Sequence, residues 1–146
     1  MTPRQLDDAV ILAKLRMMRR LLDELERLGR VDVERFAEEF AVQLVVERII
    51  SQLVDLASSI NAHVVAVETA EPPSNIRQSF TAASAVGLID HDLAGRLAPS
   101  AGLRNMLVHA YVDLDVGRLV AAVPLAAEQY GEYVRQVARW VADRNG

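Results

Sequence analysis

The chain has 146 residues, of which 51% are hydrophobic and 25% are charged, with 16 basic against 20 acidic side chains. This length predicts a single domain over residues 1–146, and the composition excludes a disordered chain and a membrane span. The net charge of -4 disfavours nonspecific nucleic-acid binding over the whole surface, and the absence of cysteine excludes disulfides and thiolate metal sites. The first residues lack the hydrophobic stretch of a secretory signal, so we expect a cytoplasmic protein that does not associate with membranes.

The first predicted helix spans residues 4–28. Its apolar side chains recur at alternating spacings of four and three residues, which is typical of a helix that packs along one seam. Gly29 stands where a helix-ending residue belongs. The recurring residues are Ile11, Leu15, Met18, Leu22 and Leu25.

The second predicted helix spans residues 33–68, with Asp32 as its N-terminal cap and Pro72-Pro73 beyond its end. Between residues 42 and 67, apolar side chains occur on most sides of this helix. Such a pattern indicates burial on several sides, either at the centre of a bundle or in an oligomer interface.

A short third helix is predicted over residues 76–86, where Gly87 stops it, and a fourth, capped by Asp90, over residues 90–111. Pro99 interrupts the fourth helix, because proline lacks an N–H group and clashes with the preceding turn. We therefore expect a kink or break near Ala98.

The last predicted helix follows the turn and cap Asp113-Leu114-Asp115, and Pro124 is expected to kink its beginning. No strand pattern and no internal repeat is visible. The sequence thus predicts an all-α fold, an up-down bundle of about five helices.

Four chemically capable side chains cluster near the end of the fourth predicted helix. At about 100° per residue, Arg104, Asn105, His109 and Tyr111 share one face of the helix, opposite an apolar stripe. Asn105 and His109 are four residues apart, so the amide can orient the imidazole, while Arg104 and Tyr111 lie in line two turns apart. These four residues are the predicted functional site.

The simpler interpretation of this face is the solvated side of an amphipathic helix. Such faces usually carry Glu, Lys and Gln, however, and Val108 and Val112 lie among the polar side chains. An apolar residue on this side indicates that another surface covers it. We therefore expect the face to lie in an interface or a cleft.

The pattern Arg104-Asn105-x-x-x-His109-x-Tyr111 resembles the R-x4-H-x-Y motif of the HEPN superfamily, specifically of its HepT-like ribonuclease toxins. The resemblance extends over nearly the whole chain and includes the seam of the first helix, the long apolar second helix and the Pro-Pro loop. It also includes the stretches 83–89 and 102–105.

Two positions depart from the pattern of the family. Ala110 stands where a glycine is common, and Pro99 is unusual in the helix that leads to the motif. Both leave the polar residues of the motif in place.

The resemblance implies a HEPN-type bundle that forms a homodimer, with two motif helices facing each other across a shared cleft. It also implies a metal-independent endoribonuclease without a cofactor, acting as the toxin of a type VII-like HepT/MntA toxin–antitoxin system. The implied partner is an MNT-type nucleotidyltransferase antitoxin, which silences the toxin by adding AMP to the motif tyrosine, here Tyr111.

The residue types suit this chemistry. Arg104 can neutralise the scissile phosphate of RNA with two parallel hydrogen bonds, and His109, with an ordinary pKa of ~6.5, suits proton transfer near neutral pH. One imidazole does not readily act as acid and base at once, but a symmetric dimer supplies a second. The expected products are a 2′,3′-cyclic phosphate and a 5′-hydroxyl. No group of histidines and carboxylates has the spacing of metal ligands.

Two alternatives stay open at this point. The chain is then either a non-catalytic helical interaction module that binds a nucleotidyltransferase partner through the motif, or a purely structural helical dimer. The second alternative leaves the face of Arg104 and His109 unexplained.

Overall fold

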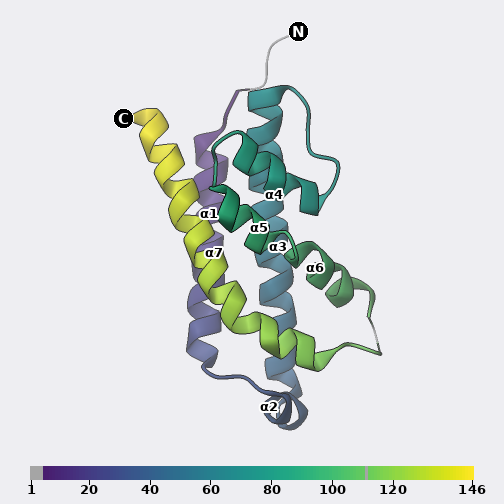
Figure 1. The fold of residues 1–146 in the computed structure, drawn as a ribbon. Coiled ribbons are helices and arrows are strands. Elements are labelled where there is room, and N and C mark those ends of the chain that lie inside the picture. The colour runs from purple at the N-terminus through teal and green to yellow at the C-terminus, as the bar shows by residue number, and fades with distance from the viewer. Residues whose placement is uncertain (1–4, 111) are drawn as a thin grey trace.

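The computed structural model describes residues 5–110 and 112–146, and within these ranges the chain forms seven helices and no strand (Figure 1). The all-α prediction is confirmed. The helices are α1 (Asp8–Leu28), α2 (Val33–Glu38), α3 (Phe40–Thr69), α4 (Ile76–Ala85), α5 (His91–Leu97), α6 (Ser100–His109) and α7 (Val116–Asn145).

The long helix α3 lies at the centre of the bundle. It packs against α1, α2, α4, α6 and α7, and eleven of its residues are buried. Figure 1 shows α1 on one side of α3 and α6 on the other. The prediction of a helix buried on several sides is confirmed, and of the two predicted reasons the structure shows the first, a position at the centre of the bundle. The N-terminal part of α3 nevertheless leaves three large apolar side chains exposed, namely Phe40 at 61%, Leu44 at 49% and Val45 at 39%.

Short polar side chains begin the helices as the sequence predicts. Asp32, Asp90 and Asp115 each accept a hydrogen bond from a backbone N–H three residues onward, at 2.7, 2.7 and 3.0 Å. Gly29 and Gly87 adopt φ values of 72° and 83° just beyond the ends of α1 and α4. This left-handed region favours glycine, which explains why both helices stop there.

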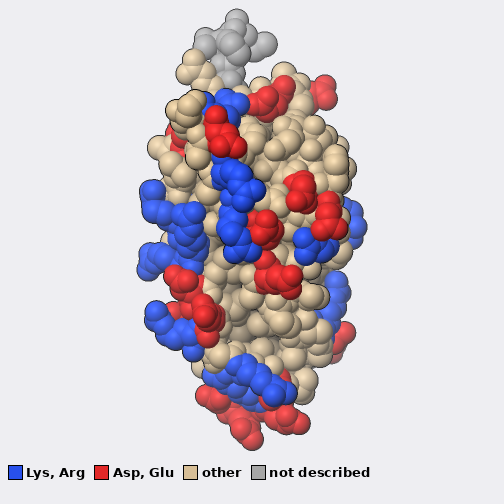
Figure 2. Space-filling model, turned by 60° about the vertical axis from the view of Figure 1, so that its left-hand side comes forward, with Lys and Arg blue, Asp and Glu red and all other residues tan. Residues whose placement is uncertain are grey.

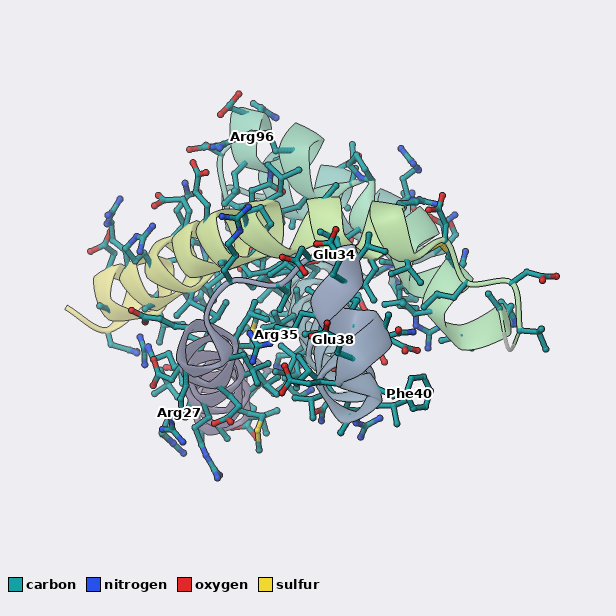
Figure 3. The ribbon with its side chains drawn as sticks, turned by 90° about the horizontal axis from the view of Figure 1, so that it is seen from below. Arg27, Glu34, Arg35, Glu38, Phe40 and Arg96 are labelled. Atoms are coloured by element: carbon teal, nitrogen blue, oxygen red, sulfur yellow. The ribbon has the colours of Figure 1, made fainter. Side chains whose placement is uncertain are left out.

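The predicted second helix over residues 33–68 is wrong in one respect, because the chain breaks at Glu39 and forms α2 and α3 separately. The Arg35 guanidinium donates to the carbonyl oxygens of Leu28 and Arg30, at 2.6 and 2.7 Å, and to the Glu39 carboxylate at 3.1 Å. The two carbonyl contacts hold α2 against the end of α1 (Figure 3). If residues 33–38 continued α3 as one straight helix, Arg35 would not reach these carbonyl oxygens.

The predicted break near Ala98 is confirmed, since α5 ends at Leu97 and α6 begins at Ser100. Pro124 lies inside α7, and Figure 1 shows this helix changing direction in its N-terminal half. The missing N–H of proline accounts for such a bend.

A buried polar network joins α3, α4 and α7. The Tyr133 hydroxyl lies 2.7 Å from Asn61 Oδ1 and 3.0 Å from the Ala57 carbonyl oxygen. Asn61 in turn donates to the Ser79 hydroxyl at 3.3 Å, and Ser79 donates to the Ile76 carbonyl oxygen. Asn61, one of the polar interruptions in the apolar helix, is thereby satisfied within the core.

Candidate functional site

The predicted site residues Arg104, Asn105 and His109 lie on α6, which packs against α3 and α4. Arg104 is half-buried, whereas Asn105 and His109 are exposed. Tyr111 lies outside the described residues.

Helix α6 ends at His109, two residues earlier than the sequence predicts. Ala110 leaves the helical region with φ -90° and ψ 89°, and its N–H makes the last helical bond to the Met106 carbonyl oxygen. The chain must reach the Asp115 cap of α7 within a few residues, and the intervening Tyr and Val are weaker helix formers than the Leu and Met before them. The expectation that Arg104 and Tyr111 lie in line on one helix involves Tyr111, which lies outside the described residues, and it stays a prediction.

An ion pair that the sequence did not predict orients Arg104. Its Nε donates to Asp55 Oδ1 of α3 at 3.0 Å, with the two side chains 29% and 49% exposed. Because only Nε is engaged, the terminal nitrogens of the guanidinium stay available for an anion. The sequence contains a signal for this role, since Asp55 is the only Asp, Glu, Lys or Arg between Ile49 and Val67.

Asn105 and His109 face solvent beside apolar residues. In the hydrogen-bond network of the described residues neither side chain takes part, so the predicted contact of Asn105 with the imidazole is not formed in this protomer. Val108 is 36% exposed and Val112 is 90% exposed. These two apolar side chains are therefore uncovered within this chain, and the expectation that the face lies in an interface or a cleft stays a prediction.

A second arginine approaches α6 from α7. Arg118 Nη1 lies 3.9 Å from Met106 Sδ, and an ideal Cβ on Gly102 would lie 3.3 Å from Arg118 Nη2. At ~100° per residue, Gly102 and Met106 lie on the same edge of α6 as His109, whereas Arg104 lies on the opposite edge. Neither Arg118 nor Asp55 belongs to the motif, so sequence spacing could not find them.

The basic residues Arg16, Arg19 and Arg20 are exposed on α1. This helix packs against α3 and α7, on the other side of α3 from α6 (Figure 1). Figure 2 shows that the basic side chains on the face turned toward the viewer alternate with acidic ones. These three arginines therefore belong to a solvated helix face and not to the site on α6.

The two other histidines make local contacts. The imidazole of His63 accepts a hydrogen bond from the Asp7 backbone N–H at 3.0 Å, and His91 Nδ1 lies 3.0 Å from the Ser84 hydroxyl. Within residues 5–110 and 112–146, no three His, Asp or Glu side chains are placed to share a metal ion. In the same part of the chain, no helix combines the length and the apolar character that crossing a bilayer requires.

Comparison with known families decides the relationship. The model of the ribonuclease HepT-like family matches residues 18–137. The chain belongs to this family. The match includes α3 and all of α6, so the HepT-like region contains both Arg104 and Asp55.

Two characterised HepT proteins are similar in sequence. The tRNA nuclease HepT of Aphanizomenon flos-aquae is 30% identical over 133 residues, which cover 90% of each chain. The mRNA nuclease HepT of Shewanella oneidensis is 26% identical over 129 residues, covering 86% of this chain and 93% of the relative.

The HepT-like fold is also found in solved structures. A tri-AMPylated Shewanella oneidensis HEPN toxin in complex with an MNT antitoxin superposes with a TM-score of 0.79 at 23% identity, over 92% of this chain and 99% of that one. A toxin–antitoxin structure with AMP-PNP has the same TM-score and identity, over 90% and 98%. These likenesses confirm the HEPN-type fold.

Proposed function

We propose that the chain is a metal-independent endoribonuclease, the toxin of a type VII-like HepT/MntA toxin–antitoxin system, folded as one domain over residues 1–146. The proposal is supported by the nuclease activity in the names of its HepT relatives. Its main structural support is the arrangement of the motif residues on α6. Arg104 is oriented through its Nε by Asp55 of α3, and His109 is exposed to solvent.

The proposed reaction needs only groups that this chain supplies. His109 removes the proton of an RNA 2′-hydroxyl, and the resulting oxygen attacks the adjacent phosphorus. Arg104 stabilises the charge that develops on the phosphoryl oxygens. The bond from phosphorus to the 5′-oxygen then breaks, and the His109 of a second copy protonates that oxygen. The products are a 2′,3′-cyclic phosphate and a 5′-hydroxyl.

The experiment digests RNA with purified protein in the presence of EDTA and identifies the new ends. Arg104→Ala and His109→Ala are expected to abolish cleavage with unchanged helix content, because both side chains lie at the surface. Arg135→Ala removes another exposed, ion-paired arginine, and His91→Ala removes another exposed histidine, so these variants are matched controls. Full activity in either motif variant would overturn the proposal. Binding of the nucleotidyltransferase without cleavage by the unmodified protein would favour the non-catalytic module.

We propose a homodimer, because the exposed apolar residues of α3 and α6 need a covering surface. Mixing unmodified protein with His109→Ala protein tests the need for two imidazoles. If each cleft uses both, a mixture of equal parts retains roughly one quarter of the activity, since only dimers of two unmodified chains cleave. A value of roughly one half would show that each imidazole acts alone.

The proposed antitoxin is an MNT-type nucleotidyltransferase that transfers AMP to Tyr111. A related toxin is AMPylated and bound to an MNT antitoxin, which supports the same partner for this chain. AMP beside Arg104 would bring a bulky anion to the phosphate site and exclude RNA by volume and charge. Asn105 is proposed to support the imidazole once the cleft forms.

A further inference from the structure

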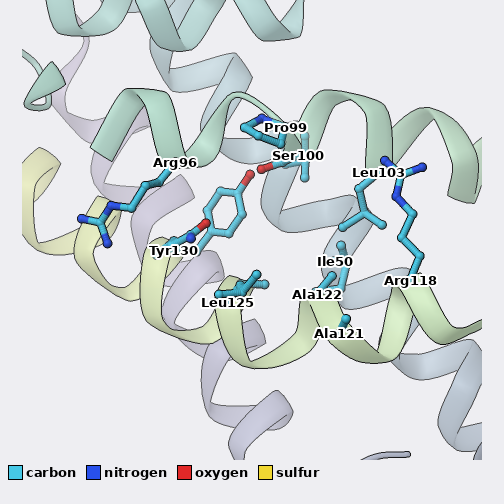
Figure 4. Close-up of a pocket in the computed structure, with 13 residues that line it drawn as sticks. Ile50, Arg96, Pro99, Ser100, Leu103, Arg118, Ala121, Ala122, Leu125 and Tyr130 are labelled. Atoms are coloured by element: carbon cyan, nitrogen blue, oxygen red, sulfur yellow. The ribbon is translucent and has the colours of Figure 1, made fainter. Parts of the chain in front are cut away.

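A cavity of about 310 Å³ lies between α6 and the N-terminal half of α7, with α3 beneath it (Figure 4). Its size is at the lower end of the range of small-molecule sites, about 300–1,000 Å³. Its walls are largely apolar. They include Ile50, Val54, Leu103, Ala121, Ala122 and Leu125.

An arginine lies at each end of the cavity. Within the described residues, one of them is neutralised by an acidic side chain, and the other is not. Arg96 pairs with Asp92 at 3.0 Å, and Figure 4 shows its guanidinium pointing away from the cavity. Arg118 reaches across to α6, and no acid of the described residues forms an ion pair with it. The uncompensated positive charge is therefore at the Arg118 end.

Gly102 makes room for Arg118 on α6. An ideal Cβ at Gly102 would lie 3.3 Å from Arg118 Nη2, so a side chain at this position would push the guanidinium away from its place. Glycine inside a helix weakens it relative to alanine, and φ at Gly102 is not in the left-handed region that would otherwise call for glycine. The absence of a side chain thus serves to seat Arg118 at the mouth of the cavity.

The inner wall of the cavity includes Tyr130, which is 2% exposed. Within the described residues its hydroxyl forms no hydrogen bond of good geometry, although the Ser100 hydroxyl, which donates to the Leu97 carbonyl oxygen, lies beside it. Burial raises the pKa of Tyr130 far above its ordinary value; the Asp55 charge adds to this rise and Ser100 opposes it. Tyr130 therefore stays neutral and keeps a hydrogen-bond donor in the wall.

The cavity adjoins the proposed catalytic site on two of its walls. Ser100 lines the cavity and Arg104 lies one turn further along the same face of α6, while the charge of Asp55 on α3 acts on Tyr130 in the cavity wall. A ligand in the cavity is therefore a neighbour of the ion pair that orients Arg104. Single-stranded RNA is commonly bound in this way, with an unstacked base in an apolar pocket and its phosphate on an arginine.

We infer that this cavity binds one nucleotide of the RNA next to the scissile phosphate, with the base between Leu103 and Ala122 and a phosphate on Arg118. This inference rests on the proposed ribonuclease function. It makes Arg118 a substrate-binding residue outside the motif, and it makes the α6–α7 cavity a determinant of which base flanks the cut.

The test measures the fluorescence anisotropy of labelled RNA tetranucleotides with His109→Ala protein, which binds without cutting. Arg118→Ala is expected to weaken binding about tenfold, the loss of one charge-assisted hydrogen bond. Arg135→Ala should leave affinity unchanged. Gly102→Leu, which displaces Arg118, should weaken binding like Arg118→Ala, whereas Gly95→Leu, at a helical glycine without neighbours, should not.

The base is tested with tetranucleotides that carry one abasic position, moved along the oligonucleotide. An abasic site at one of the four positions, the one whose base would enter the cavity, is expected to weaken binding to the His109→Ala protein. The same abasic position should have no effect once Ala122→Phe fills the cavity, while circular dichroism confirms that this variant remains helical. Equal affinity for all abasic oligonucleotides, or unchanged binding by the Arg118 and Ala122 variants, would overturn the inference.

Two further measurements show whether a negative result contradicts the cavity proposal or the ribonuclease proposal. An adenosine or uridine monophosphate that binds as tightly as the tetranucleotide would assign the cavity to a free nucleotide and overturn the RNA subsite. If the unmodified protein cleaves RNA while the cavity variants bind normally, the inference fails and the ribonuclease proposal stands. If the tetranucleotide binds as expected but is never cleaved by the unmodified protein, the cavity stands and the proposed catalysis fails.

Discussion

Replacing Asp55 separates its effect on stability from its effect on the orientation of Arg104. The pair is 29% and 49% exposed, so solvent screens it, and exposed ion pairs contribute only about 0.2–1 kcal/mol to the free energy of unfolding. Asp55→Ala should therefore lower the free energy of unfolding by less than about 1 kcal/mol. Its effect on cleavage should be much larger, because the guanidinium loses the one side chain among the described residues that fixes its direction.

Two variants distinguish orientation from charge. Asp55→Ala is expected to reduce kcat about 10- to 100-fold, the loss typical of a misplaced catalytic group. Asp55→Asn keeps an oxygen that accepts the Nε hydrogen bond, so kcat should stay within about threefold of the unmodified value. The asparagine variant also removes a negative charge near the RNA, and its KM should fall.

Steady-state cleavage of a labelled RNA at several concentrations gives kcat and KM separately, and urea denaturation gives the stability. Glu132→Ala, which breaks the exposed ion pair with Arg135 on α7, is the matched control. A kcat of Asp55→Ala equal to that of the unmodified protein would refute the positioning role. So would a loss in Asp55→Asn as large as that in Asp55→Ala, since the hydrogen bond alone would then not suffice.

Three other outcomes follow from the structure. Tyr133→Phe should lower the free energy of unfolding by about 1–3 kcal/mol in urea denaturation, because it leaves Asn61 Oδ1 without its buried donor; a loss below ~0.5 kcal/mol would contradict this. The Leu93 backbone N–H and then Gln136 lower the pKa of Asp90 from 3.8, so the carboxylate stabilises the fold above that pH and loses this effect as acid protonates it. Thermal unfolding of Asp90→Asn should therefore approach that of the unmodified protein as the pH falls from 5 toward 3, and parallel curves would show that Asp90 does not contribute. Intact-mass measurement with the nucleotidyltransferase and ATP should find AMP on the unmodified protein and none on Tyr111→Phe.

The sequence predicts the helices well wherever a local rule decides. The caps at Asp32 and Asp90 and the break at Pro99 depend on neighbouring residues only, and each is found where the sequence places it. The break at Glu39 depends instead on Arg35 bonding to carbonyl oxygens at the end of α1. Helical periodicity carries no information about such a tertiary contact.

The same limit applies to the site. The spacing of Arg104 and His109 can be seen in one stretch of sequence, and both residues do lie on α6. Asp55 is 49 positions from Arg104 along the chain, and Arg118 contacts α6 only because α7 folds back against it. Both were therefore invisible to motif spacing, although the isolated charge of Asp55 in an apolar helix indicated that it has a partner.

The arrangement on α6 gives a chemical reason for the proposed dimer. Five residues of α-helix turn by about 500°, so Arg104 and His109 point about 140° apart. Asp55 draws Arg104 toward α3, while His109 faces solvent on the edge that Arg118 shares. A phosphate that contacts both Arg104 and the imidazole of the same chain therefore lies over the surface between them, where Val108 is exposed. In the proposed dimer, a two-fold axis that brings a second α6 against the first would place the other imidazole across from Arg104, and the apolar Val108 would then lie in the interface.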